Sequence, residues 1–306
     1  MNAMAAERNR VVCFLGDSIT ANGGWIGYIS AYFAAHGRRK TLFRNCGVSG
    51  TTAGCAIERL YSDCLCHNPD AVYISFGIND IGWNLYEREY REGCDLSDEK
   101  SAALDSYAAT MDRLVTLCLG YGTEPILLTP TAYDDVSDID RPALTCNTGL
   151  EKCIQTLAEI SGRHGVKLID VFTPFRSRLG EGITLDRTHP NDAGDRIIAA
   201  ALLRENGYDA TDSLLAGIAV TGTEKKRRET ESILRSAGYV RWYMGMKSRT
   251  PEEAAENIAR LYSEARSENA PGFMKKIADD YSSAVCGSQY LEGELVRLTR
   301  EIYNGE

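Results

Sequence analysis

Residues 10–20, RVVCFLGDSIT, combine an apolar run with a polar turn. The first six residues of this stretch are mostly apolar, with β-branched and aromatic side chains, which is typical of a buried strand. Gly16 and Asp17 end the apolar run, and a helix is expected over residues 24–35. Ser18 therefore follows directly after a strand. In parallel sheets the carboxyl ends of the strands carry the ligand sites, so Ser18 is placed at such an edge.

The same alternation of strand and helix continues through the first two-thirds of the chain. Further strands are expected at residues 41–46, 71–76, 125–129 and 166–169. Further helices are expected at residues 53–61, 98–119, 143–164 and 192–205. Strands that alternate with helices form βαβ units, so the pattern predicts an α/β fold with a mainly parallel, five-stranded sheet covered by helices on both faces.

The composition excludes several classes of protein. The chain has 306 residues, of which 43% are hydrophobic and 25% charged, and its formal net charge is −9. This acidic balance argues against a nucleic-acid-binding protein, because such domains are usually basic. We expect no membrane insertion, since the sequence contains no run of 18 apolar residues. The apolar run that follows the polar N-terminus is too short for a secretory signal, so a cytoplasmic location is expected.

Ten cysteines are scattered over the chain without a secretory signal, which favours reduced thiols over disulfides. Only Cys64-Leu65-Cys66-His67 has a spacing that resembles a set of metal ligands. A second Cys/His pair is missing nearby, so buried thiols that pack as small apolar side chains are the preferred interpretation. We expect neither a metal ion nor another cofactor.

The last third of the chain differs in composition. Residues 224–306 hold 14 Lys+Arg and 14 Asp+Glu, so the net charge resides in the preceding part. Amphipathic helices are expected near residues 224–237, 251–266, 272–286 and 289–303. We therefore predict a first domain over residues 1–207 and a linker with a helical extension over residues 208–306. The extension would serve packing, or contact with a second copy or another protein.

Polar residues follow four of the five predicted strands. Besides Ser18, the segments that follow strands are NCGVSGTT (residues 45–52), FGIND (76–80) and DRTHPNDAG (186–194). Ester hydrolysis by a serine requires a base, a group that orients the base, and preset donors for the oxyanion. Ser18 supplies a nucleophile, His189 a base and Asp186 an orienting carboxylate. The N–H groups of Ser18 and Gly50 and the Asn79 amide supply the donors of an oxyanion hole.

These segments resemble the sequence blocks of the SGNH hydrolases, also called GDSL-type esterases or lipases. The resemblance rests on Gly16-Asp17-Ser18-Ile19, Val48-Ser49-Gly50, Gly77-Ile78-Asn79-Asp80 and Asp186-Arg187-Thr188-His189-Pro190, in the order of the family. It spans about residues 10–205 and implies a flavodoxin-like, three-layer α/β/α sandwich with a Ser-His-Asp triad. By motif match, Ser18, Gly50, Asn79 and His189 take the roles that name the family, and Asp186 completes the triad. The first block has isoleucine where the family has leucine.

Three aromatic residues at the same edge are candidates for contact with the substrate. Trp83 and Tyr86 follow Asn79 closely, and Tyr133 lies in the acidic loop after the fourth strand. For Trp83 and Tyr86, an aromatic wall for a sugar or acyl group and a packing cluster are both compatible with the spacing. Asp17 is expected to accept hydrogen bonds within its loop, and Asp80 is expected to cap a helix or turn.

A serine esterase that hydrolyses small acyl esters, above all acetyl groups on carbohydrate, is the function expected from these residues. No long hydrophobic cap is evident, which disfavours a lipid-chain tunnel. The resemblance also permits a thioesterase, a lysophospholipase or an acyltransferase. Outside this class, a metal-dependent phosphoesterase would need more histidine ligands than the four histidines of the chain provide. A non-catalytic binding module would leave the coexistence of these motifs unexplained.

Overall fold

The structure is a computed structural model. It describes residues 10–37, 41–139, 144–247, 250–265, 275, 293–298 and 301. Its contacts divide the chain into two compact units. The first comprises Met1–Gly47 with Thr51–Val220, and the second comprises Val48–Gly50 with Thr221–Glu306.

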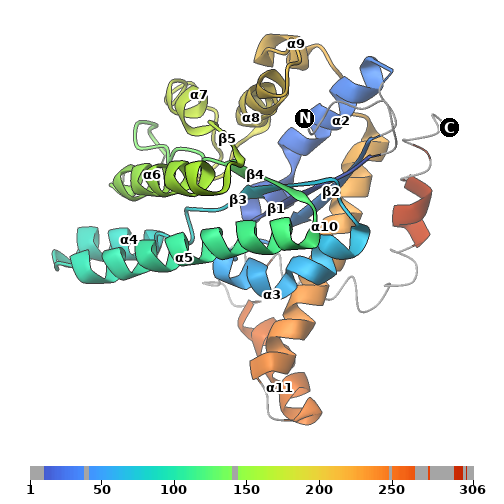
Figure 1. Cartoon of the computed structure of the whole chain (residues 1–306). Helices are drawn as coiled ribbons and strands as arrows, with labels where there is room; N and C mark the ends of the chain where they lie inside the picture. The colour runs from blue at the N-terminus through green and yellow to red at the C-terminus, as the bar shows by residue number, and fades with distance from the viewer. Residues whose placement is uncertain are drawn as a thin grey trace. The chain divides into compact units, whose positions relative to one another are not determined.

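The first unit is built on a five-stranded parallel sheet (Figure 1). Its strands are β1 (Arg10–Gly16), β2 (Thr41–Gly47), β3 (Ala71–Ser75), β4 (Glu124–Leu128) and β5 (Lys167–Ile169). They lie in the order β2-β1-β3-β4-β5, which is the order of flavodoxin-like folds. Each strand starts and ends within two residues of the range expected from the sequence. The parallel α/β fold is therefore confirmed.

Helices cover both faces of the sheet. On one face α2 (Gly24–Ala35) packs against α8 (Asp192–Glu205), and on the other α5 (Ser97–Tyr121) packs against α3 (Ala53–Asp63) and α6 (Cys146–His164) (Figure 1). Shorter elements lie in the connections: α1 (Ser18–Asn22), η1 (Leu65–His67), α4 (Trp83–Glu92), α7 (Phe172–Arg176) and α9 (Asp212–Ala216). The predicted three-layer sandwich is thus present. The first unit also includes α9, which contacts α8.

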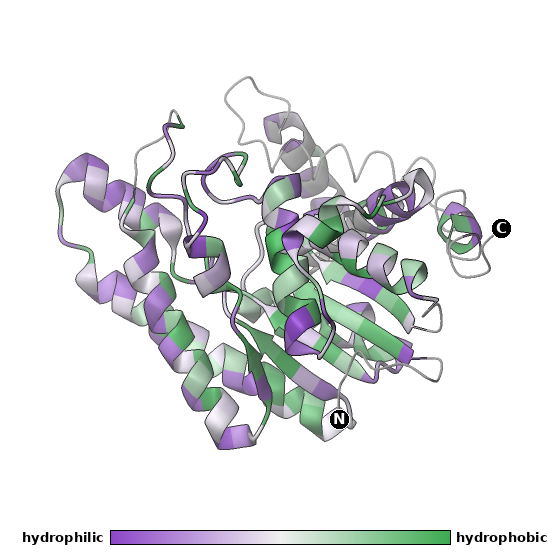
Figure 2. Cartoon of the chain, turned by 90° about the horizontal axis from the view of Figure 1, so that it is seen from above, coloured by the Kyte–Doolittle hydropathy of each residue, from purple (hydrophilic) through white to green (hydrophobic). Residues whose placement is uncertain are grey.

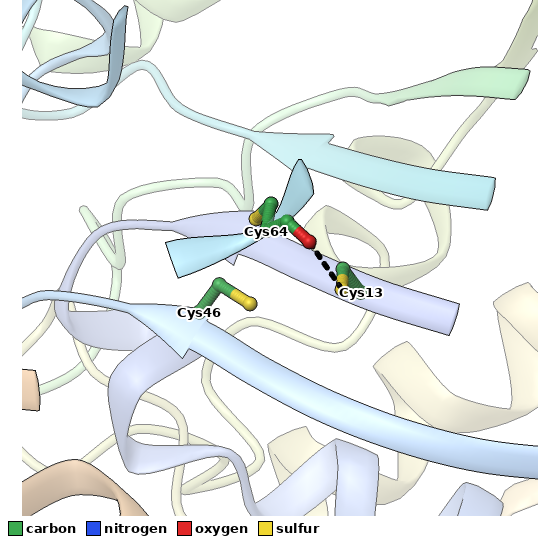
Figure 3. Close-up of side chains that lie close together, drawn as sticks. All are labelled: Cys13, Cys46 and Cys64. Atoms are coloured by element: carbon green, nitrogen blue, oxygen red, sulfur yellow. Dashed lines mark hydrogen bonds between the residues drawn. The ribbon is translucent and has the colours of Figure 1, made fainter. Parts of the chain in front are cut away.

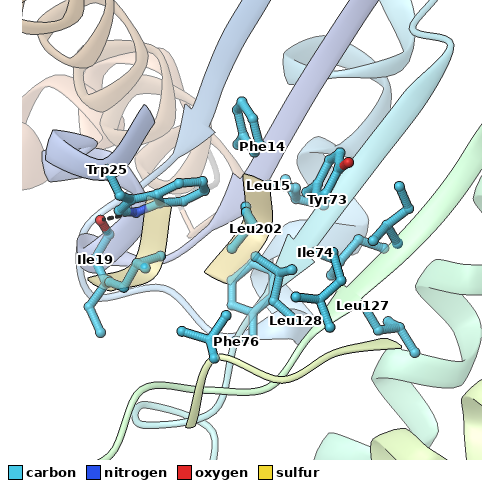
Figure 4. Close-up of a cluster of buried hydrophobic side chains, with 14 of the residues drawn as sticks. Phe14, Leu15, Ile19, Trp25, Tyr73, Ile74, Phe76, Leu127, Leu128 and Leu202 are labelled. Atoms are coloured by element: carbon cyan, nitrogen blue, oxygen red, sulfur yellow. Dashed lines mark hydrogen bonds between the residues drawn. The ribbon is translucent and has the colours of Figure 1, made fainter. Parts of the chain in front are cut away.

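The core forms where apolar side chains of the strands meet the helices. Phe14 packs edge-on against Trp25, with ring centroids 4.9 Å apart, and lies 5.2 Å from the Tyr73 ring (Figure 4). The Trp25 indole N–H donates to the Ile19 carbonyl at 3.3 Å. Figure 2 shows that the strands are mainly hydrophobic, whereas hydrophilic and hydrophobic residues alternate along the long helices. Burial on both faces explains why these strands are continuous apolar runs.

Two glycines allow α1 to lie close against the strand ends. A Cβ on Gly16 would stand 2.1 Å from Thr20 Oγ1 and 2.7 Å from the Ser75 carbonyl. A Cβ on Gly47 would stand 2.3 Å from the Ala21 nitrogen. Any larger residue would push α1 away from the sheet, and Ser18 with it.

In the second unit, the described helices include α10 (Gly222–Lys247) and α11 (Pro251–Ala265). At the start of α11, Thr250 Oγ1 accepts from the Glu253 N–H at 3.2 Å, which is the N-cap contact typical of this residue type. Within α10, Arg227 forms ion pairs with Glu224 and Glu231, both at 3.0 Å. Of the other two predicted helices, nearly all of residues 272–286 and much of residues 289–303 lie outside the described residues.

None of the helices in the described ranges is both long and apolar enough to cross a membrane.

Candidate active site

Ser18 is the first residue of α1, immediately after β1. The preceding residue, Asp17, caps this helix, because its carboxylate accepts from the Ile19 N–H at 3.0 Å. The N–H groups of a first helical turn have no partner within the helix. The turn therefore presents the Ser18 hydroxyl and backbone N–H at the carboxyl edge of the sheet, as the sequence predicts.

The structure brings His189 and Asp186 to this serine. His189 Nε2 lies 2.8 Å from Ser18 Oγ, although the two residues are 171 positions apart. On the other side of the ring, His189 Nδ1 lies 2.8 Å from Asp186 Oδ2 and 3.0 Å from Oδ1. The side chains of His189 and Asp186 are 28% and 38% exposed, so the site is accessible from solvent.

The ionisation state of Asp186 determines which nitrogen of His189 carries the ring proton. Burial alone would raise its pKa, but the hydrogen bonds from the His189 side chain and from the N–H groups of His189 and Thr188 outweigh burial and lower it to about 2. An ionised carboxylate only accepts hydrogen bonds, so Nδ1 carries the imidazole proton. When the ring carries one proton, Nε2 is then the nitrogen that accepts the hydroxyl proton of Ser18.

Asn79 follows β3 at the same edge. Its Nδ2 donates one hydrogen to the Thr51 carbonyl at 3.0 Å, which orients the amide and leaves the second hydrogen available. Gly50 precedes Thr51 on the loop after β2, is exposed, and has a φ of 75°. The left-handed backbone conformation explains a glycine at this position. Participation of the Gly50 N–H in an oxyanion hole stays a prediction.

A buried arginine that the sequence analysis missed supports the strand ends beside the site. The Arg59 guanidinium donates to the carbonyls of Gly16 (2.9 Å), the last residue of β1, and Cys46 (2.7 Å), the last but one of β2. It also pairs with Asp63 at 2.8 Å. Arg59 is only 4% exposed. Its position on an otherwise ordinary amphipathic helix contains no local signal for this role.

Two buried carboxyl groups neighbour the site in the chain: Asp17 precedes Ser18, and Asp80 follows Asn79. Burial raises the pKa of Asp17 to about 6 and that of Asp80 to about 7, although hydrogen bonds to backbone N–H groups act in the opposite direction. Asp80 Oδ1 accepts from the Ala53 N–H at 2.8 Å, at the first turn of α3. Its Oδ2 is buried and has no hydrogen-bond partner among the described residues. Asp17 thus accepts a hydrogen bond within its own loop, whereas Asp80 accepts one from a residue 27 positions away, and burial shifts both groups toward the neutral form.

The three aromatic candidates differ in exposure. Tyr86 and Tyr133 are 5% and 6% exposed and belong to the hydrophobic core. The packing interpretation therefore describes Tyr86, while Trp83, at the start of α4, is 39% exposed and retains a free ring surface. The spacing of the aromatic residues could not separate these cases, because burial depends on the helices packed around them.

Three buried thiols form a cluster, and only one of them, Cys64, belongs to the Cys64–His67 motif of the sequence. Sγ atoms of Cys13, Cys46 and Cys64 all lie within 4.8 Å of one another, from β1, β2 and the end of α3 (Figure 3). Cys46 donates to the Asp63 carbonyl at 2.9 Å. Burial raises the pKa of Cys64 well above its ordinary value, which favours neutral thiols packed as small apolar groups. Cys66, the next cysteine of the motif, is exposed.

A parallel sheet with a Ser–His–Asp chain of contacts at its carboxyl edge is typical of α/β serine hydrolases. Comparison with known protein families supports the assignment to this class. Residues 14–197, more than half of the chain, match the GDSL-like lipase/acylhydrolase family. The chain therefore belongs to this family, also called SGNH hydrolases, and it is a carboxylic ester hydrolase.

Among characterised relatives, an acetylxylan esterase from Geobacillus stearothermophilus is 28% identical over 216 residues, which cover 64% of this chain and 93% of the relative. Crystal structures of an acetylxylan esterase from this organism match with a TM-score of 0.56 and 26% identity, over 67% of this chain and 98% of theirs. They include catalytic mutants in which a serine, an aspartate or a histidine is replaced by alanine, and the last two residues are three positions apart.

A gut microbial diltiazem-metabolizing enzyme has a TM-score of 0.76 with 15% identity, over 98% of this chain and 96% of its own. This likeness concerns the fold alone.

Proposed function

We propose that the protein hydrolyses acetyl esters, with carbohydrate as the substrate class, through a covalent acyl-enzyme on Ser18. The observation that carries the proposal is the pair of 2.8 Å contacts that join Ser18 Oγ to His189 Nε2 and His189 Nδ1 to Asp186. A hydroxyl, an imidazole and an ionised carboxylate in this order form the arrangement that activates a serine.

In the first half-reaction, Ser18 Oγ attacks the ester carbonyl carbon while His189 Nε2 takes the hydroxyl proton. The C–O bond of the tetrahedral intermediate then breaks, and His189 returns that proton to the leaving alcohol. The products of this step are a free alcohol and an acetyl group on Ser18. Asp186 stays ionised and stabilises the imidazolium that forms in between.

In the second half-reaction, a water molecule attacks the acetyl-enzyme and gives one proton to His189. Ser18 Oγ leaves and takes this proton back, and acetic acid is released, which loses its remaining proton to solvent. An alcohol in place of water would transfer the acetyl group instead. Both half-reactions place negative charge on the carbonyl oxygen. The Ser18 N–H and the second hydrogen of the Asn79 amide are the proposed donors to this oxygen.

Two observations support the substrate class. The relative that is 28% identical to this chain over 216 residues is an acetylxylan esterase. The catalytic aspartate and histidine of that kind of enzyme lie three positions apart, as Asp186 and His189 do, which supports the triad itself. In addition, the exposed ring of Trp83 lies only four residues after Asn79, and an indole face can pack against a sugar ring.

The test compares acetate release from acetylated xylo-oligosaccharides with hydrolysis of p-nitrophenyl esters of two, four and eight carbons. We expect the acetyl substrates to give the highest kcat/KM, and Ser18→Ala to lower it by at least 10³-fold. Ser101→Ala makes the same chemical change at an exposed position of α5 and should leave hydrolysis unchanged.

Full activity of Ser18→Ala would refute the serine mechanism. A kcat/KM that rises steadily to the eight-carbon ester would refute the acetyl preference and favour a thioesterase or lysophospholipase.

A further inference from the structure

Arg187 lies in the turn between Asp186 and His189, in an unusual backbone conformation. Its φ is 73°, and Asn68 is the only other non-glycine residue with a positive φ in the described ranges. A left-handed conformation is unfavourable for a residue with a Cβ, and it persists only where the surrounding contacts impose it. The turn that carries the base and its orienting carboxylate is therefore held by something stronger than local preference.

The contacts of Arg187 identify what holds it. The residue is 5% exposed, and its guanidinium reaches the loop that follows β4. There Nη1 donates to the Asp134 carbonyl at 2.8 Å and Nη2 donates to the Ile139 carbonyl at 2.9 Å. In return, the Asp134 N–H donates to the Arg187 carbonyl at 2.8 Å. One side chain thus joins both ends of residues 134–139 to the turn.

Asp134 makes a further connection between the same two segments. Its carboxylate accepts from Thr184 Oγ1 at 2.8 Å, and Thr184 lies two residues before Asp186. It also accepts from the N–H groups of Val136 and Ser137, at 3.2 and 2.9 Å. Burial acts to raise the pKa of Asp134, but these hydrogen bonds outweigh it and lower the pKa. The carboxylate is therefore ionised and accepts these bonds strongly.

The contacts inside the turn cannot replace these connections. Asp186 accepts from the Thr188 and His189 N–H groups, and Leu185 N–H donates to the His189 carbonyl at 2.8 Å. All of these contacts would survive if the turn moved as a unit. They do not determine how far the turn lies from Ser18, which belongs to a different strand end.

We propose that Arg187 is a positioning residue, which fastens the Asp186–His189 turn to the loop after β4 and so holds His189 Nε2 within hydrogen-bond distance of Ser18 Oγ. This inference rests on the proposed function, because it concerns the same serine. A displacement of about 1 Å in a catalytic group can lower the rate by about 10²-fold. The effect acts on chemistry and leaves substrate binding nearly unchanged.

The geometry also explains why this position requires arginine. Two carbonyls that lie five residues apart are reached by the two terminal nitrogens of one planar guanidinium. A lysine at this position would carry the same charge at a single nitrogen, and could not present the same rigid pair of donors.

The experiment measures kcat and KM for p-nitrophenyl acetate in Arg187→Ala, Arg187→Lys and Arg187→Gly, at a temperature well below unfolding. We expect kcat to fall by about 10–100-fold in all three variants, with KM within about threefold of wild type. Glycine relieves the backbone conformation without restoring the contacts, so it should be no more active than alanine. Arg163→Ala removes a 60% exposed arginine from α6 and should keep the wild-type kcat.

A second pair of variants, at Thr184, tests the same proposal if the Arg187 variants do not fold. Thr184→Val removes the hydroxyl that donates to Asp134, whereas Thr184→Ser keeps it. We expect a several-fold loss of kcat in the valine variant and none in the serine variant.

A wild-type kcat in Arg187→Ala, or equal kcat in Thr184→Val and Thr184→Ser, would overturn the positioning role. Hydrolysis that is equal in wild type and Ser18→Ala would instead refute the proposed function, so the two failures are distinguishable.

Discussion

Replacing Asp80 by asparagine tests whether the Asp80 carboxyl group, next to Asn79 in the chain, is neutral in the folded protein. Asparagine has nearly the same shape and keeps an oxygen for the Ala53 N–H, which donates to Asp80 Oδ1 at 2.8 Å. It cannot ionise. The variant therefore removes only the component of stability that depends on the charge of residue 80.

The magnitude follows from the shift in pKa. Burial raises the pKa of Asp80 from 3.8 to about 7. Between these values the folded protein keeps a proton that the unfolded chain has released, so the free energy of unfolding falls as the pH rises. Each pH unit corresponds to about 1.4 kcal/mol, and the interval from pH 5 to pH 7 therefore corresponds to at most about 3 kcal/mol. Near pH 8 both states are almost fully ionised, and the loss is nearly complete.

The assay is urea-induced unfolding of wild type and Asp80→Asn at pH 5 and pH 8. Between these pH values, wild type should lose up to about 3 kcal/mol more than the variant. Asp17, whose pKa is also raised, is present in both proteins, and its charge contributes to the raised pKa of Asp80, so the difference between the two proteins includes this interaction. Asp105→Asn, at an exposed position of α5, should show the same change in the free energy of unfolding between pH 5 and pH 8 as wild type. An equal change in the free energy of unfolding for wild type and Asp80→Asn would refute a neutral Asp80.

Three other outcomes are expected. Asn79→Ala should lower kcat for p-nitrophenyl acetate by about 10²–10³-fold, because one donor to the oxyanion is lost, and a loss below threefold would exclude that role. Asp186→Asn should lower kcat by about 10⁴-fold, since a neutral amide no longer orients the imidazole. The lowered pKa of Asp186, about 2, stabilises the fold above pH 3.8, and this stability is lost as pH falls toward 2. Acid unfolding of Asp186→Asn should therefore show a weaker pH dependence in this range. Treatment with EDTA should leave hydrolysis unchanged, whereas a loss restored by divalent metal would favour a phosphoesterase.

Several features follow from local sequence patterns. Apolar runs such as residues 11–15 are buried on both faces of the sheet, and the helices between them show their own periodicity, so strand and helix positions could be predicted closely. The motifs around Ser18 and Asn79 follow β1 and β3, and the carboxyl ends of parallel strands share one edge. The Asp186–His189 segment was expected at the end of the fifth strand, but it lies beyond α7 and directly before α8. The sequence alone therefore determined the α/β class, the family and the residues to be examined as a site.

Other features depend on contacts between distant segments, and only the tertiary structure decided them. Arg59 lies on a helix like any exposed arginine, yet it is buried because two strand ends present carbonyls to it. Tyr86 is a core residue while the nearby Trp83 is exposed, because α4 presents only one face to its neighbours. The fastening of Arg187 to Asp134 joins segments 53 residues apart. Periodicity reports which face of an element is apolar, but the partner that a polar side chain meets is set by the packing of the whole unit.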